Sequence, residues 1–189
     1  MQKKELSLLA KPGNGYAFMK RREHRKYRSY LLDIAQKSAS MCAFCHYEAK
    51  NAFDVFHIIN VDGDYSNNAP DNHILACDFC AYSQLLDLAL LSQYNHSLIL
   101  LPNMSQADLN RKYQYFRDLI AKGENIFEVK EALNELESLS KQVEQVVQIK
   151  TDFKDYLGLL FNKPAAGDDF LCAIRWLPGY DFLQHFNWS

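Results

Sequence analysis

Four of the five cysteines in this 189-residue chain occur as two pairs with the same spacing. Cys42 and Cys45 form the first C-x2-C pair, and Cys77 and Cys80 form the second. Two intervening residues let both sulfurs of a pair bind one metal ion from a tight turn, and two such pairs supply the four thiolates of a closed tetrahedral zinc site. The sequence therefore predicts one structural Zn²⁺; the alternative is four buried cysteines without a metal.

The predicted zinc site bears on both folding and chemistry. Structural zinc can supply on the order of 10 kcal/mol to a metal-dependent fold, and residues 40–80 hold few large apolar side chains of their own. We therefore expect the ion to organise this segment. Because four thiolates leave no open coordination position, the ion should not activate water. The fifth cysteine, Cys172, lies in the apolar run FLCAIRW and is predicted to be a buried small residue.

Composition favours a packed protein with an uneven charge distribution. Hydrophobic residues make up 48% of the chain, which argues against disorder, and the formal net charge is −2. Residues 1–40 nevertheless carry ten Lys/Arg against three Asp/Glu. A phosphate-binding face, a solvated helix face and a face that meets an acidic partner all stay open for this basic segment. Its cations are Lys20, Arg21, Arg22, Arg25, Lys26 and Arg28.

The apolar runs are too short to cross a bilayer, which needs about 18 apolar residues. The N-terminal stretch MQKKELSLLAKPG is also too short to hold the core of a signal peptide. We therefore expect a cytoplasmic protein with no membrane insertion, in which cysteines serve as metal ligands or free thiols rather than disulfides.

The N-terminal half predicts a mixture of strands and helices. Residues 5–19 suggest a strand hairpin around the turn Pro12-Gly13-Asn14-Gly15, and residues 20–37 have the apolar spacing of one amphipathic helix. The run FDVFHIIN resembles a strand, and VDGDYSNNAPDN is rich in turn formers. A helix is expected from near Cys80 through SQLLDLALLS, followed by the strand-like SLILLP.

The C-terminal half predicts helices and an aromatic tail. Ser105 is a predicted N-cap for QADLNRKYQYFRDLIAKG, and Gly123 a natural C-terminal stop. Further helices are expected over residues 127–148 and 152–161, and the tail 168–189 should fold back because so apolar a segment would otherwise aggregate. We therefore expect residues 1–102 and 103–189 to form a zinc-binding part and a helical extension within one structural unit.

The segment FDVFHIINVDGDYSNNAPDNHILACDFCA resembles the HNH, or ββα-metal, endonuclease family. That family places a metal-binding Asp before a general-base His on a strand, an Asn that orients the His, and a second metal-binding His directly after C-x2-C. By position, His57 falls on the general base and Asn72 on the orienting Asn. The two metal-ligand positions fall on Phe56 and Ala81, which cannot bind a cation.

Loss of the catalytic metal argues against nuclease activity. Phosphodiester cleavage of this kind needs the cation to offset charge in the transition state. A general base alone contributes about 10²–10⁴-fold, far less than the reaction requires. We therefore expect no enzyme activity. The segment does offer other side chains that could replace the lost ligands: Asp54, Asp62, Asp64, His46, His73 and Asp78.

A closer resemblance covers roughly residues 5–125. The motifs INVDGDYSNN, CDFCA and LLPNMSQADLN, together with CAFC and in their order, resemble the IcmJ (DotN) family of Dot/Icm type IVB secretion systems. Their loop residues would not be shared by a general HNH domain, whereas the C-terminal third of the chain matches poorly. The resemblance implies an α+β fold with an HNH-like zinc-stabilised core and additional helices, mostly in the C-terminal half.

The same resemblance implies a function in protein transport. Such proteins are non-catalytic adaptors that bind the cytoplasmic C-terminal extension of the coupling ATPase, in a complex that recruits effectors for export. A cytoplasmic protein held at the inner membrane through its partner is therefore expected. The alternatives are a nucleic-acid-binding protein that uses the basic segment on phosphate, and an atypical nuclease.

Overall fold

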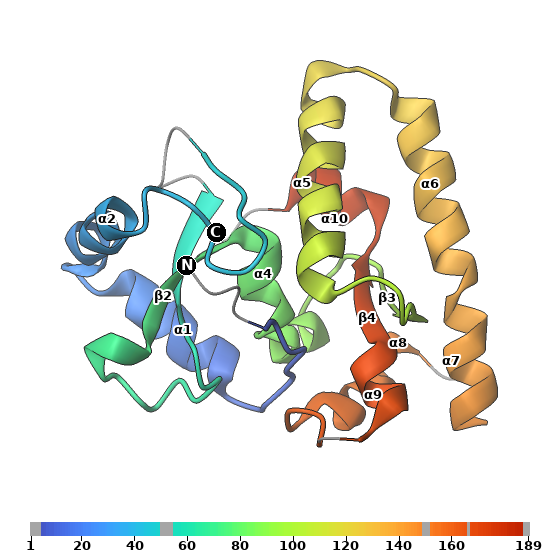
Figure 1. Ribbon diagram of the computed structural model, residues 1–189, viewed down its shortest axis with the longest axis horizontal. Coiled ribbons are helices and arrows are strands. Elements are labelled where there is room, and N and C mark those ends of the chain that lie inside the picture. The colour runs from blue at the N-terminus through green and yellow to red at the C-terminus, as the bar shows by residue number, and fades with distance from the viewer. Residues whose placement is uncertain (1–4, 50–54, 149–151, 166, 187–189) are drawn as a thin grey trace.

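Helices and two small antiparallel sheets make up the part of the chain that the structure describes. The structure is a computed structural model and describes residues 5–49, 55–148, 152–165 and 167–186. Each sheet has two strands, and the helices surround both of them (Figure 1). The predicted α+β class is confirmed. No helix in these described ranges combines the length and hydropathy that a bilayer span requires.

The first sheet lies in the N-terminal half and continues directly into a helix. Strand β1 (Phe56–Asn60) pairs antiparallel with β2 (His73–Cys77), and His57 lies opposite Ala76 in the register. Helix α4 (Asp78–Ser83) begins at the residue after β2, and all six of its residues are buried. All five residues of β1 are buried as well, so this strand and α4 lie in the core rather than at the surface.

The predicted hairpin over residues 5–19 is wrong, and so is the single helix over 20–37. Helix α1 (Asn14–Glu23) begins after Gly13, whose φ of 90° turns the chain, and a short connection separates it from α2 (Tyr27–Lys37). The first residues of α1 form hydrogen bonds with groups that are far away in the sequence. Asn14 Nδ2 donates to the Gly63 carbonyl at 2.9 Å, and the Gly15 N–H donates to Asp87 Oδ2 at 2.9 Å. Such long-range partners leave no signal in the local sequence.

The helix expected from Cys80 through Ser92 is interrupted. Helix α4 ends at Ser83, and a separate 3₁₀ helix, η2, spans Leu86–Leu90. The extended N-terminal segment meets the chain at this interruption. The Leu9 N–H donates to the Ser83 carbonyl at 3.0 Å, and the Leu86 N–H donates to the Leu9 carbonyl at 2.9 Å. Backbone bonds to another segment therefore replace the helical bonds that a continuous helix would make. A further 3₁₀ turn, η1 (Pro70–Asn72), leads into β2.

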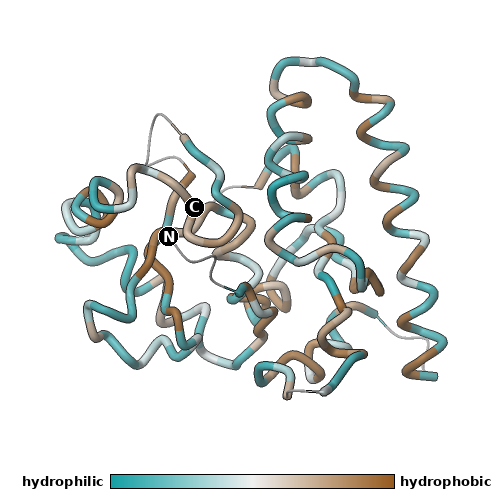
Figure 2. Tube along the Cα trace, viewed as in Figure 1, coloured by the Kyte–Doolittle hydropathy of each residue, from teal (hydrophilic) through white to brown (hydrophobic). Residues whose placement is uncertain are grey.

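The C-terminal helices follow the sequence prediction more closely. Helix α5 (Gln106–Lys122) begins after Ser105, whose Oγ accepts the Asp108 N–H at 3.1 Å, and ends at Gly123 with a φ of 71°. Helix α6 (Ile126–Ser138) runs back beside α5, and α7 (Ser140–Val147) continues it, as Figure 1 shows. The predicted helix over 127–148 is thus divided at Leu139. In Figure 2 hydrophobic and hydrophilic residues alternate along α6 and α7, as expected for helices with one packed face.

Only one of the two strands of the second sheet was predicted from the sequence. Strand β3 (His96–Leu100) matches the strand-like SLILLP, but it pairs antiparallel with β4 (Ile174–Pro178), which lies in the tail. Since β3 precedes residue 102 and β4 follows it, the two expected parts of the chain share this sheet. The described residues between α7 and β4, 152–165 and 167–173, form short elements only.

One prediction for this region was wrong and another is confirmed. The expected helix over 152–161 divides into α8 (Phe153–Tyr156) and the 3₁₀ helix η3 (Leu157–Leu160). Two short helices, α9 (Asp169–Ala173) and α10 (Tyr180–His185), flank β4. The described part of the tail folds back onto the body, as expected.

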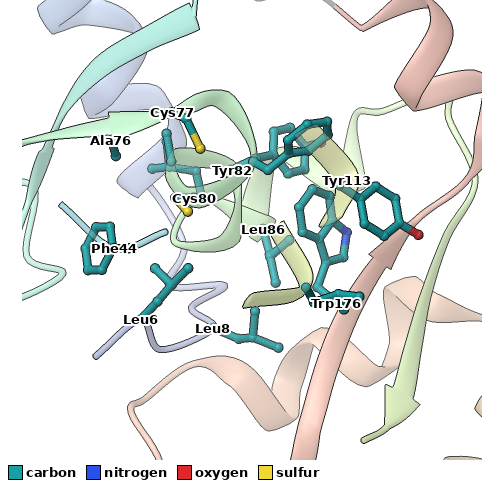
Figure 3. Packing of buried hydrophobic residues seen from close by; sticks show 14 of the residues in the cluster. Leu6, Leu8, Phe44, Ala76, Cys77, Cys80, Tyr82, Leu86, Tyr113 and Trp176 are labelled. Atoms are coloured by element: carbon teal, nitrogen blue, oxygen red, sulfur yellow. The ribbon is translucent and has the colours of Figure 1, made fainter. Parts of the chain in front are cut away.

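Aromatic packing holds the tail in place. Trp176 of β4 is fully buried and stacks on Tyr82 of α4 at a ring distance of 5.1 Å, and Phe182 of α10 contacts Trp176 edge-on at 5.5 Å. In Figure 3 Tyr82 lies between Cys77 and Cys80 on one side and Trp176 and Tyr113 on the other. The tail therefore packs directly against the helix that carries the second cysteine pair.

Replacement of the central tail residue tests this packing. We expect Trp176→Ala to lower the free energy of unfolding by about 3–5 kcal/mol, because it removes a fully buried ring from both Tyr82 and Phe182. Urea denaturation followed by circular dichroism measures the loss. Tyr16→Ala is the control, since Tyr16 is 68% exposed and its loss should change stability by about 0.5 kcal/mol at most. A Trp176→Ala effect as small as that of the control would contradict the packing.

Candidate metal centre

The four paired cysteines meet at one buried point. Cys42 and Cys45 lie in a turn after α2, Cys77 ends β2, and Cys80 lies in the first turn of α4. Their Sγ atoms all lie within 4.8 Å of one another, with Cys45 and Cys77 at 3.5 Å. A tetrahedron with metal–sulfur bonds of about 2.3 Å has sulfur–sulfur edges of about 3.8 Å. The arrangement is therefore a candidate site for a tetrahedral metal ion.

Backbone hydrogen bonds shape the first cysteine pair. The Cys42 N–H donates to the Tyr47 carbonyl at 2.9 Å, and the His46 N–H donates to the Cys42 carbonyl at 3.1 Å. His46 takes a left-handed φ of 58°, which reverses the chain directly after Cys45. The Ala43 N–H donates to the Leu75 carbonyl at 2.9 Å and thus ties the turn to β2. These bonds place the first pair of thiols opposite the second.

Burial and the contacts among the four thiols shift their pKa values in opposite directions. Burial raises the pKa of the Cys77 and Cys80 thiols, whereas hydrogen bonds from the three other thiols outweigh burial at Cys42 and hold its pKa well below the usual range. Asn110 Nδ2 of α5 donates to Cys80 Sγ at 3.4 Å. Within the described residues, these cysteines form the only group of three or more His, Cys, Asp or Glu side chains close enough to hold a metal.

A buried ionic network lies behind the cysteine site. His57 Nε2 of β1 lies 2.7 Å from Asp78 Oδ1 of α4, and Arg117 Nη1 of α5 donates to Asp78 Oδ2 at 2.5 Å. Arg117 Nη2 also donates to Gln114 Oε1 at 2.6 Å. Asp78 is 4% exposed, so both of its oxygens are satisfied by charged or polar partners inside the protein. The network joins the first sheet, α4 and α5.

The pKa shifts in this network follow from burial and the ion pairs. Burial, partly offset by Asp78, lowers the pKa of His57, so its imidazole is neutral over a wider pH range than a free histidine. Burial alone would raise the pKa of Asp78, but the bonds from His57 and Arg117 outweigh burial and lower it. A neutral histidine therefore lies beside a carboxylate whose charge Arg117 balances.

His57 is packed, and apolar residues occupy the positions beside it. His57 is 3% exposed and meets Phe18 edge-on at a ring distance of 5.8 Å. Phe56 and Ala81, at the two expected metal-ligand positions, are both fully buried in the hydrophobic core. Neither of these two positions therefore offers a side chain that can bind a cation.

Asn72 takes part in a loop rather than in the network around His57. Its Oδ1 accepts the Asp62 N–H at 3.1 Å, and its Nδ2 donates to Asp62 Oδ1 at 3.0 Å. Asp62 also accepts the Asp64 N–H at 2.8 Å, while Asp64 accepts the Ser66 N–H at 3.0 Å. Both carboxylates therefore form the Asx turns that such sequences favour.

The other substitute ligands considered are also separated from His57 or otherwise engaged. Asp78 binds His57 directly, as described, and His73 Nδ1 lies 2.9 Å from the hydroxyl of Tyr30. His46 forms the turn after the first cysteine pair. Asp54 lies outside the described residues. The structure thus brings the four cysteines together, and it does not gather the carboxylates and histidines around His57 into a second ligand cluster within the described ranges.

Sequence reasoning missed two residues and misplaced one. Arg117 and Asn110 on α5 contact Asp78 and Cys80, respectively, yet both look like ordinary polar positions of an amphipathic helix. The one available signal was that each falls near the apolar face of α5. Cys172, predicted to be buried, is exposed, because the apolar side chains around it belong to a short helix that faces solvent on this side.

Comparison with known proteins identifies one relative of this chain. The two small sheets and the buried four-cysteine centre define a small α+β protein with a candidate metal site. No protein-family model matches the chain. The chain is 36% identical over 110 residues to the type 4 apparatus protein DotN of Legionella pneumophila. The aligned part is 58% of this chain and 50% of DotN, so the chain spans about half the length of that relative. The resemblance to the IcmJ (DotN) family is thereby confirmed.

Removal of one cysteine tests the candidate metal site. We expect Cys77→Ser to lose the bound metal and to lower the free energy of unfolding by more than about 4 kcal/mol, because three thiolates hold the ion less tightly and its binding energy is part of the folding energy. Metal analysis and thermal unfolding measure both effects. Cys172→Ser is the matched control, since that thiol is exposed. Equal melting temperatures for Cys77→Ser and wild type would contradict a structural metal.

Removal of the cation tests the buried network. We expect Arg117→Met to lower the free energy of unfolding by about 3 kcal/mol, because it leaves the Asp78 carboxylate buried without its cation. Arg117→Lys should recover part of the loss, since it keeps the charge but not both hydrogen bonds. Arg111→Met, at an exposed position of α5, should change stability by about 0.5 kcal/mol at most. Equal stability of Arg117→Met and Arg111→Met would show that the network does not hold the fold together.

Proposed function

We propose that this chain is a non-catalytic, zinc-stabilised adaptor of a type IVB secretion coupling complex. In this role it binds the cytoplasmic C-terminal region of the coupling ATPase and helps to recruit effectors. The observation that carries the proposal is the relation to DotN, which is a type 4 apparatus protein. A cytoplasmic position, at the inner membrane through the ATPase and other coupling-complex subunits, follows from the same role.

The nature of the centre supports zinc as its metal. Four thiolates in a closed, buried set match the ligands and geometry of structural zinc, which needs no redox chemistry and prefers a tetrahedron. The order of β1, β2 and α4, with the second cysteine pair at the start of the helix, supports an HNH-like core. In this proposal Cys42, Cys45, Cys77 and Cys80 bind the ion, and the ion contributes stability only.

The surroundings of His57 support the absence of catalysis. The imidazole is buried and bound to Asp78, and Phe56 and Ala81 occupy the positions where the HNH family has metal ligands. Asn72 uses its side chain within the loop. A general base needs access to a water molecule and to a substrate, and a buried histidine within an ionic network has neither.

The principal alternative is nucleic-acid binding through the basic segment. Of its six cations, Arg21 donates to Asn60 Oδ1 at 2.6 Å, Arg22 is half-buried and lies over the Phe18 ring, and Lys20 pairs with Glu23 at 3.1 Å. Arg21 and Arg22 are thus partly buried and engaged within the protein, so they are less available for phosphates. The exposed cations of the segment are Lys20, Arg25, Lys26 and Arg28.

Capture of the ATPase tail tests the proposed role. We expect the purified full chain to bind the cytoplasmic C-terminal region of the coupling ATPase from its own organism, with a one-to-one stoichiometry in isothermal titration calorimetry. The ATPase without that region is the control and should not bind. Absence of binding by a folded, metal-loaded protein would contradict the adaptor role.

A nuclease assay separates the adaptor from an enzyme. We expect no cleavage of supercoiled plasmid with Mg²⁺ or Mn²⁺, because Phe56 and Ala81 cannot hold a catalytic cation. His57→Gln is assayed in parallel, with thermal unfolding to confirm that the variant folds. Cleavage by the wild-type protein that the folded variant lacks would overturn the proposal in favour of an atypical nuclease.

A further inference from the structure

A surface pocket opens where α1 and α2 meet the loop before β2. Its volume is about 430 Å³, within the range of pockets that hold a small ligand or a large side chain. The connection between α1 and α2 that borders it is hydrophilic and projects from the molecule in Figure 2. The lining residues are Arg21, His24, Lys26, Tyr27, Ser29, Tyr30, Asn68 and His73. Neither the four-cysteine site nor the network around His57 contributes to this lining.

The aromatic part of the pocket is held in a fixed arrangement. Tyr27 accepts the Ile58 N–H at 3.2 Å through its hydroxyl, and the hydroxyl of Tyr30 lies 2.9 Å from His73 Nδ1. Arg21 bonds Asn60 and Asn68 and lies over the ring of Tyr65 at 5.4 Å. Because hydrogen bonds on the protein side fix these side chains, little conformational entropy is lost when a ligand enters. The pocket is therefore preorganised for ligand binding.

The charge around the pocket is positive. Arg21 and Lys26 line it, and Arg25 is exposed in the same connection. Within the part of the chain that the structure describes, neither Arg25 nor Lys26 forms an ion pair. Residues 1–40 hold ten Lys/Arg and three Asp/Glu, so the surroundings reinforce the local charge. An anionic group beside the pocket would find complementary charge, and an aromatic side chain within it would contact tyrosine rings and cations.

We propose that this pocket is the docking site for an acidic segment of the coupling ATPase tail, which packs an aromatic side chain against Tyr27 and Tyr30 and places carboxylates beside Arg21 and Lys26. The inference rests on the proposed function, because it takes the ATPase tail as the source of the segment. A free phosphate or the backbone of a DNA duplex would satisfy the cations but not the aromatic walls, because the bases of a duplex are already stacked on one another.

Two substitutions block the pocket without touching its fixed residues. Ser29→Trp fills it from an exposed helical position, and Lys26→Glu reverses the charge at its rim. Each has a matched control on α6 or α7. Ser138 is exposed and, like Ser29, donates its hydroxyl to the carbonyl three residues earlier, so Ser138→Trp is equivalent except in position. Lys141→Glu makes the same charge change at an exposed site of α7.

Binding is measured by fluorescence anisotropy with overlapping labelled peptides from the ATPase tail and with a labelled DNA duplex. We expect wild-type protein to bind a peptide that combines Asp/Glu with an aromatic residue, with a Kd that rises with salt concentration. Ser29→Trp and Lys26→Glu should each weaken binding by about tenfold or more, while Ser138→Trp and Lys141→Glu change it by less than about twofold. Replacement of the aromatic residue in the peptide by Ala should cause a similar loss.

Other outcomes separate the inference from the proposed function. Tail binding that Ser29→Trp and Lys26→Glu leave unchanged would overturn the pocket but keep the adaptor role. Failure of every tail peptide and of the whole tail to bind would overturn both. DNA binding that the same two variants abolish, without peptide binding, would assign the pocket to nucleic acid instead.

Discussion

The convergence of four thiols is the constraint on which the N-terminal half depends. A turn after α2, the end of β2 and the first turn of α4 must all reach one point for the four Sγ atoms to lie within 4.8 Å of one another. This requirement fixes β2 against the turn and sets the direction in which α4 leaves the sheet. Because α4 is wholly buried, every later element that packs on it takes its position from the cysteine site.

Helix α4 passes that constraint to the C-terminal half through three contacts. Asp78 at its start binds Arg117 of α5, Cys80 accepts a hydrogen bond from Asn110, and Tyr82 stacks on Trp176 of β4. These contacts join the cysteine site and the first sheet to the C-terminal helices by a charge, a polar bond and aromatic packing. The same carboxylate also holds His57, so the histidine that the sequence resemblance assigned to a general base is part of a buried ionic network.

Local chemistry explains which parts of the structure could be predicted from the sequence. The cysteine spacing, the Ser105 cap and the Gly123 stop are short-range signals, and the structure shows all three in the expected places. The start of α1, by contrast, depends on Gly63 and Asp87, and the end of α4 depends on Leu9. Those partners are far away in the sequence, so no local pattern could reveal them.

The candidate site likewise combines features that the local sequence predicts with features that depend on long-range contacts. The four cysteines that meet there were predicted from spacing alone. The bond between His57 and Asp78 requires the antiparallel register of β1 and β2, and the position of Arg117 requires the packing of α5. Strand β4 was missed because its run IRWLP is short and pairs with a strand more than seventy residues earlier, Ile174 lying opposite Leu100. Aromatic content correctly predicted that the tail packs, but it could not predict the tail's secondary structure.

X-ray absorption at the zinc K-edge of the purified full chain tests the central claim most directly. The account predicts about one zinc ion per chain with a first shell of four sulfur atoms at about 2.3 Å and no oxygen or nitrogen ligand. A shell that contains oxygen or nitrogen would mean an open or different site, and a folded protein without zinc would mean that the four thiols need no metal. Either result would contradict a scaffold held together by structural zinc.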